Sequence, residues 1–168
     1  MEVITPTAHL NELPSGIDGV RATLKRMVQI VRRYKSDQTT IGAARGILKS
    51  AATERDAGSM IAALQGWVRD KIMYVADPTD LEMLQTPPRT LTVMTGDCDD
   101  KAILLATFLE SVGLKTRFEA IGVNGGPYSH VLLSVRYGNK WLPLETIVPG
   151  APPGWFPPDA TSLMVAHV

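Results

Sequence analysis

The most informative stretch of the chain is GDCDDKAILLATFLESVG, residues 96–113. It predicts a helix, because Asp97 is a good N-cap, acidic residues follow in the first turn, and Gly113 stands where a left-handed C-cap is needed. Cys98 then falls at the first helical position. The helix is apolar on almost every side, which indicates that it lies buried at the centre of the molecule.

Two strands are predicted after this helix. Residues 115–123 and 128–137 alternate between apolar and polar side chains, and Asn124-Gly125-Gly126-Pro127 forms the turn between them. A helix followed by antiparallel strands indicates the α+β fold class, with the central helix packed on an antiparallel β-sheet.

Gly138-Asn139 is expected to form a two-residue hairpin turn that leads into a third strand. In that register Leu132 pairs with Glu145, and His130 pairs with Ile147. His130 and Glu145 are then diagonal neighbours on one face of the sheet, with Cβ atoms somewhat less than roughly 7–8 Å apart. At that distance an imidazole and a carboxylate can meet.

Helices are predicted in the N-terminal part. A second helix covers residues 41–52, and a third has its apolar face between residues 60 and 72 and ends at Asp77-Pro78. Residues 77–96 are predicted to form a long loop, because Pro87-Pro88 excludes regular structure. In the first helix, apolar residues recur at spacings of three and four, which is typical of an amphipathic helix. These residues are Val20, Leu24, Met27, Val31 and Tyr34.

The length and composition indicate one domain. The chain has 168 residues, of which 45% are hydrophobic, and this is enough to build a real core. We divide the domain, residues 1–168, into an N-terminal helical extension (1–56), a core (57–150) and a Pro-rich C-terminal segment (151–168). The prolines of APPGWFPP indicate loops in that last segment.

The charge balance argues against nucleic acid and anionic membranes as partners. Lys and Arg number 17, Asp and Glu number 17, and the formal net charge is zero. The first helix has a basic face, which we interpret as a solvated helix surface; the alternative is an interaction domain that binds nucleic acid through it. That face consists of Arg21, Lys25, Arg26, Arg32 and Arg33.

The sequence predicts a cytoplasmic protein. No run approaches about eighteen apolar residues, and the N-terminus lacks a basic segment followed by an apolar one, so neither a membrane span nor a signal peptide is expected. The single cysteine, Cys98, cannot close an intramolecular disulfide and gives no sign of an oxidising compartment.

No metal or cofactor is expected. Asp97, Asp99 and Asp100 superficially look like a calcium loop, but Phe108 stands where that loop needs a bidentate Glu. Zinc ligands at the usual spacings and phosphate-binding glycine motifs are both missing from the sequence.

A thiol on the first turn of a helix, a histidine in a strand and an acid diagonal to it are what thiol nucleophilic catalysis requires. A helix N-terminus and an imidazolium lower the pKa of a thiol, and a carboxylate orients the imidazole. The acidic residues around Cys98 would raise its pKa if they faced it, so we expect them to cap the helix or to bind Lys and Arg. The alternative is that Cys98 and His130 are ordinary core residues and Glu145 a surface acid.

Three blocks of the chain, within residues 60–150, resemble the Cys, His and Asp blocks of the transglutaminase-like (papain-like) cysteine enzyme superfamily. The resemblance implies a papain-like or transglutaminase-like core in which Cys98 is the nucleophile, His130 the general base and acid, and Glu145 the orienting acid. Glu145 departs from the usual Asp of the third block. The blocks are Gly96-Asp97-Cys98-Asp99-Asp100, Tyr128-Ser129-His130-Val131 and Trp141-Leu142-Pro143-Leu144-Glu145.

An oxyanion hole needs two donors. The backbone N–H of Cys98 is one, since it lies at a helix N-terminus. Gln85 is the side-chain amide available in the preceding loop, and Thr92 and Thr95 are alternatives to it. The aromatic pair Trp155-Phe156 is expected either to form a wall of the substrate cleft or to cap the core.

The predicted reaction is acyl transfer through an acyl-thioenzyme. Water as the acceptor gives a cysteine peptidase or amidase acting on a protein or peptide, and a lysine-like amine gives transamidation; we favour hydrolysis because the chain is small. The alternative is a catalytically inactive structural or binding module. The chain also resembles small transglutaminase-like proteins encoded by tailed phages and prophages, which implies association with a virion and phage structural proteins as partners.

Overall fold

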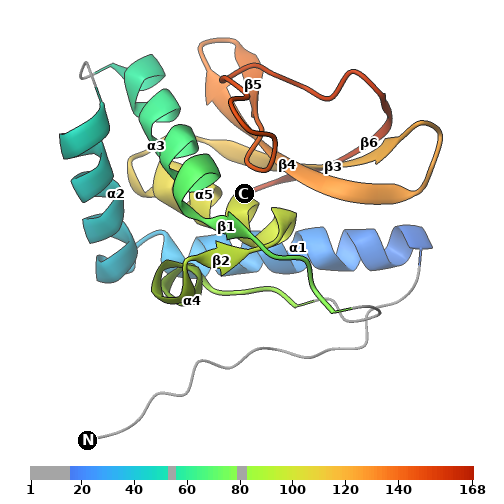
Figure 1. Ribbon diagram of the computed structural model, residues 1–168, viewed down its shortest axis with the longest axis horizontal. Coiled ribbons are helices and arrows are strands. Elements are labelled where there is room, and N and C mark those ends of the chain that lie inside the picture. Colours follow the sequence, from blue (N-terminus) through green and yellow to red (C-terminus); the bar gives the residue numbers. More distant parts are fainter. Residues whose placement is uncertain (1–15, 53–55, 79–82) are drawn as a thin grey trace, which may run out of the picture.

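The computed structural model describes residues 16–52, 56–78 and 83–168. Parts of three predictions lie outside the described residues: the helical extension before residue 16, its end at residues 53–55, and the middle of the predicted 77–96 loop, residues 79–82. Figure 1 shows helices on the left and along the bottom, a sheet at the upper right, and one helix between them. No helix of the described part is long and apolar enough to cross a membrane.

The enclosed helix is α5, and the sequence prediction of it is confirmed. It covers Cys98–Ser111, and every residue from Asp99 to Leu109 is buried. Asp97 is the N-cap, with its carboxylate accepting a hydrogen bond from the N–H of Asp100 at 3.0 Å. Gly113 has φ +88° just beyond the helix. The helix contacts α1 (Gly16–Tyr34), α2 (Gln38–Ala51), α3 (Ala57–Lys71), α4 (Pro87–Val93) and two strands of the sheet.

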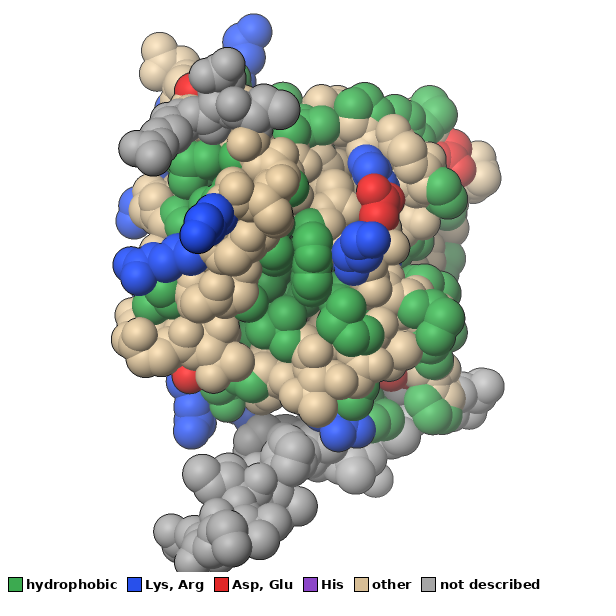
Figure 2. All heavy atoms as spheres, turned by 60° about the vertical axis from the view of Figure 1, so that its left-hand side comes forward, with side chains coloured by type: hydrophobic (Ala, Val, Ile, Leu, Met, Phe, Trp, Pro, Cys, Tyr) green, Lys and Arg blue, Asp and Glu red, His purple; other side chains and the backbone are tan. Residues whose placement is uncertain are grey.

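The first three helices follow their predicted patterns. Leu24, Met27 and Val31 of α1 are buried, and Val20 and Tyr34 pack partly buried against the same core. α2 begins three residues earlier than predicted, because Asp37 caps it by accepting from the N–H of Thr40. On the face drawn in Figure 2, Lys and Arg side chains stand in separate small groups with apolar side chains between them.

The main sheet has the strand order β5-β4-β3-β6 and is antiparallel throughout. β3 (Thr116–Val123) and β4 (Tyr128–Tyr137) match the two predicted strands, and β5 covers Lys140–Leu144. The predicted hairpin register is confirmed over the length of β5, since Tyr137 pairs with Lys140 and Leu133 with Leu144. Because β5 ends at Leu144, the predicted pairs of Leu132 with Glu145 and of His130 with Ile147 are not part of the ladder. One face of the sheet packs on α5 and completes the core. Its buried residues there are Phe118, Ala120, Val131, Leu133 and Val135.

The prediction of a loop over residues 77–96 was wrong for residues 87–93, which form α4, and for residues 95–96, which form a short strand. Pro87 and Pro88 begin α4, because the first helical positions need no bonded N–H and proline already has a helical φ. α3 ends at Lys71, earlier than predicted, and the chain then forms β1 (Met73–Tyr74). β1 pairs in parallel with β2 (Thr95–Gly96), which leads directly into α5.

The C-terminal segment contains a strand that the prolines concealed. β6 covers Ala160–His167 and pairs with β3 at the edge of the sheet. Its side chains alternate between half-buried and exposed, as in a strand. The exposed positions include apolar residues such as Leu163, which is 50% exposed, so the sequence does not alternate clearly between apolar and polar residues. Before β6, Trp155 is half-buried and Phe156 is exposed, and neither lines the cavity described below.

Gly122 marks an irregularity of β3 where the register with β4 shifts. A Cβ there would lie 2.5 Å from the Ser162 Oγ, and 2.6 and 3.0 Å from the backbone oxygens of Gly126 and Pro127. Two of these neighbours are backbone atoms, which cannot turn away. Any side chain at this position therefore displaces the turn that precedes the His130 strand.

We predict that Gly122→Ala lowers the free energy of unfolding by about 1–3 kcal/mol, as overpacking does. Gly46→Ala in α2 is the matched control, because nothing lies within 4 Å of its Cβ; a gain of up to about 1 kcal/mol is expected there from helix propensity. Urea denaturation of both variants measures the difference. Equal effects of the two substitutions would contradict the steric account.

Candidate active site

Cys98 stands at the entrance of α5, where β2 passes into the helix. Its side chain is half-buried. The preceding Gly96 is held tightly, because a Cβ on it would lie 2.6 Å from the Cβ of Asp100, which is itself buried. The close approach of the chain to its own first helical turn thus fixes the position of the sulfur.

His130 and Glu145 meet as the hairpin register predicts. His130 Nε2 lies 2.7 Å from Glu145 Oε2. The other carboxylate oxygen, Oε1, accepts from the backbone N–H groups of Thr146 and Ile147, both at 2.7 Å. Burial opposes ionisation of this fully buried carboxyl, but the hydrogen bond and charge of His130, together with the two N–H groups, outweigh it and lower the pKa of Glu145.

The thiol and the imidazole share one cavity of about 390 Å³. α1 forms one wall, and β1, the start of α5 and the β3–β4 pair form the rest. Because Glu145 occupies Nε2 of His130, Nδ1 is the ring nitrogen left for proton exchange inside the cavity. The residues lining it are Gly16, Gly19, Val20, Thr23, Leu24, Tyr74, Asp97, Cys98, Asp99, Ala120, Tyr128, Ser129, His130 and Val131.

The expectation that the neighbouring acids turn away from the thiol was only partly right. Asp97 caps the helix, but Asp99 Oδ1 lies 3.5 Å from Cys98 Sγ and accepts from it. Burial raises the pKa of Cys98, the charges of Asp99 and Asp97 raise it further, and the N–H of Val131 opposes them only in part. The resting side chain is therefore a thiol, not the thiolate that the helix N-terminus alone would favour.

Gln85, predicted as an oxyanion donor, does not line the cavity. Its side-chain N–H groups donate to Asp100 Oδ2 at 2.7 Å and to the carbonyl of Thr95 at 3.3 Å. Its backbone N–H donates to Asp100 Oδ1 at 2.7 Å. The amide is thus engaged with a buried carboxylate, and the alternative Thr92 is exposed and donates to the carbonyl of Pro88.

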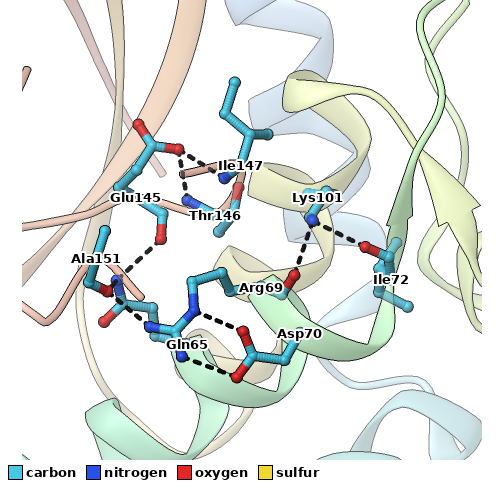
Figure 3. A network of polar contacts seen from close by, with 9 residues as sticks. All are labelled: Gln65, Arg69, Asp70, Ile72, Lys101, Glu145, Thr146, Ile147 and Ala151. Carbon is cyan, nitrogen blue, oxygen red and sulfur yellow. Dashed lines mark hydrogen bonds and ion pairs between the residues drawn. The ribbon is translucent and has the colours of Figure 1, made fainter. Parts of the chain in front are cut away.

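A buried polar network behind the site was missed from the sequence (Figure 3). On α3, Gln65 Nε2 donates to the backbone carbonyl of Glu145 at 2.9 Å, and Arg69 Nη1 donates to that of Ala151 at 2.7 Å. On α5, one turn after Cys98, Lys101 Nζ donates to the carbonyls of Arg69 and Ile72 at 3.1 and 2.8 Å. A lysine directly before the apolar run 102–106 of a helix predicted to be buried was the available signal.

Within residues 16–52, 56–78 and 83–168, no three His, Cys, Asp or Glu side chains converge as a metal site requires. The groups that Cys98, His130 and Glu145 bring to the site are a thiol, an imidazole and a carboxylate.

We predict that Gln85→Ala lowers the free energy of unfolding by about 1–3 kcal/mol, because a buried carboxylate loses one of its donors. Thr92→Ala, which removes an exposed hydroxyl, is the control and should change it by less than about 0.5 kcal/mol. Urea denaturation measures both. If Gln85→Ala keeps full stability but loses acyl transfer, Gln85 is an oxyanion donor after all.

We predict a pH dependence that arises from Asp100. Burial and the charge of Asp97 raise its pKa to about 7, although the two hydrogen bonds from Gln85 oppose the shift. Between the ordinary pKa of 3.8 and about 7 the unfolded chain has lost the proton that the folded chain keeps. The unfolding free energy of the wild type should therefore fall relative to that of Asp100→Asn as the pH rises through this window.

Denaturation of both proteins at a series of pH values measures that difference. A gap between the two that stays constant across the window would show that Asp100 ionises like an exposed carboxyl.

Comparison with known families adds to this geometry. A model of the transglutaminase-like superfamily matches residues 42–146, which include Cys98, His130 and Glu145. No curated protein matches the chain.

Solved structures share the fold at low sequence identity. LapG of Legionella pneumophila is 18% identical, with 89% of this chain and 82% of LapG covered and a TM-score of 0.56. A Cytophaga hutchinsonii protein provisionally named a cysteine protease is 13% identical, with 85% and 56% covered and a TM-score of 0.52. A Parabacteroides distasonis protein provisionally named a protease is 10% identical, with 87% and 32% covered and a TM-score of 0.61. The chain thus spans about half and about a third of the last two.

Proposed function

Because the chain belongs to the transglutaminase-like superfamily, we propose that it is a cysteine-dependent acyl-transfer enzyme with Cys98, His130 and Glu145 as its triad. One observation carries the proposal: the His130 ring bonded to a buried, ionised Glu145 lines the same cavity as the only thiol of the chain. An exposed histidine or an acid elsewhere on the sheet would not combine these features.

The raised pKa of Cys98 sets the order of proton transfers. The thiol is protonated at rest, so Nδ1 of His130 takes its proton as the sulfur attacks the carbonyl carbon of an amide. A C–S bond forms, the imidazolium is stabilised by Glu145, and its proton goes to the nitrogen of the leaving amine as the C–N bond breaks. The product is an acyl-thioenzyme.

Water completes the cycle. His130 takes a proton from the water that attacks the thioester, and the thiol recovers a proton when the C–S bond breaks. An amine in place of water gives transamidation. We propose hydrolysis of an amide or peptide bond in a protein or peptide; two proteins of the same fold that carry protease names support this choice.

Thiol labelling tests the proposal. Because the chain has one cysteine, the uptake of iodoacetamide reports on Cys98 alone. We predict that at pH 7 the wild type is alkylated at least roughly tenfold faster than His130→Ala, which has lost the base that shares the proton. Labelling is followed by intact mass, and urea-unfolded protein gives the rate of an ordinary thiol.

His167→Ala is the matched control, because the His167 ring packs edge-on against Trp141 and does not line the cavity. Its labelling rate should equal that of the wild type. If the wild type reacts no faster than the unfolded chain and His130→Ala changes nothing, the chain is a structural or binding module that keeps the fold without the chemistry. Phage proteins would then be the partners to test first.

A further inference from the structure

An acyl transfer builds negative charge on the carbonyl oxygen, and this oxygen needs hydrogen-bond donors. The N–H of Cys98 at the start of α5 is one. Gln85 is committed to Asp100, so a second donor must be found among the side chains that line the cavity. Four residues that line the cavity carry a hydroxyl that can donate: Thr23, Tyr74, Tyr128 and Ser129.

Tyr74 is the one that the backbone ties to the nucleophile segment. It pairs with Gly96 in the β1–β2 ladder, two residues before Cys98. The N–H of Val75 donates to the carbonyl of Gly96 at 3.1 Å, and that of Met73 donates to the carbonyl of Met94 at 2.9 Å. Tyr74 therefore lies between two hydrogen bonds to residues 94–96, the segment that leads into α5.

The other hydroxyls come from different walls. Thr23 belongs to α1, and Tyr128 and Ser129 begin β4, the strand that carries His130. A donor on β4 stands on the side of the general base. Tyr74 approaches from β1 instead, which leaves the base its own side of the reacting carbonyl.

The electrostatics keep the Tyr74 hydroxyl in the form that donates. Burial raises the pKa of the phenol, and the charges of Asp97 and Asp99 raise it further. Tyr74 lines the cavity that Cys98 also lines, and a raised pKa keeps the proton on the phenol oxygen at neutral pH. A protonated phenol beside the nucleophile is a donor without a charge of its own.

Resting on the proposed function, we propose that the Tyr74 hydroxyl is the second donor of the oxyanion hole, together with the N–H of Cys98. The sulfur forms a bond to the carbonyl carbon while the C=O π pair moves onto oxygen. Tyr74 and Cys98 donate hydrogen bonds to that oxygen and transfer no proton. The pair returns when the leaving group departs, and the acyl-thioenzyme remains.

Two reactions of the same thiol separate this role from others. Alkylation by iodoacetamide needs the sulfur but no oxyanion donor, whereas acylation by p-nitrophenyl acetate needs both. For Tyr74→Phe in the full chain, we expect acylation, measured as nitrophenol release and as acetyl-enzyme mass, to fall roughly 100-fold. Alkylation should stay within about twofold of the wild type. Tyr137→Phe, on the far end of β4 and outside the cavity, should change neither rate.

Several outcomes would overturn the proposal. If Tyr74→Phe is acylated as fast as the wild type, the Tyr74 hydroxyl is not an oxyanion donor. If only Tyr128→Phe is acylated more slowly, Tyr128 is the donor instead. Equal loss of alkylation and acylation would show that Tyr74 acts on the thiol or on the fold, which urea denaturation would reveal. If p-nitrophenyl acetate acylates the wild type no faster than it acylates His130→Ala, the proposed function itself is wrong, and this inference with it.

Discussion

Helix α5 is enclosed by helices on one side and by β3 and β4 on the other, and its first turn alone reaches the cavity. Burial of its apolar side chains is the main favourable term that holds the layers together. Because Cys98 is the first residue of that helix, whatever fixes α5 also fixes the sulfur. His130 and Tyr74 line the same cavity from separate elements. His130 lies on β4, which packs against α5, and Tyr74 lies on β1, which pairs with the strand that leads into α5.

A buried charge, that of Lys101, joins α5 to the end of α3. The Lys101 ammonium is 2% exposed and would be costly there without partners. It donates to two carbonyls where α3 ends, and cations suit that end of a helix. Burial lowers its pKa, while the charge of Glu145 works in the opposite direction. Gln65 holds the backbone of Glu145 from α3, so the acid is constrained through its main chain as well as its carboxylate.

The elements predicted from the sequence were those with a local signal. The N-cap and C-terminal glycine of α5 and the Gly138-Asn139 turn act over a few residues, and the register of that turn was enough to bring His130 to Glu145. The sequence does not reveal α4, because a proline pair signals a break in regular structure as well as the start of a helix. The engagement of Gln85 with Asp100 and the orientation of Asp99 toward the thiol depend on contacts between segments, which spacing along the chain does not encode.

The way Glu145 holds its carboxylate explains how a longer acid fits a place where the resemblance suggested a shorter one. The side chain folds back so that one oxygen is gripped by the two peptide groups that follow it, while the other oxygen reaches the ring. The longer side chain of Glu145 thus keeps its contact with His130 while its other oxygen stays bonded to the backbone. Replacement by aspartate would keep the charge but shorten the reach by one methylene, so keeping the charge at this position does not keep the shape.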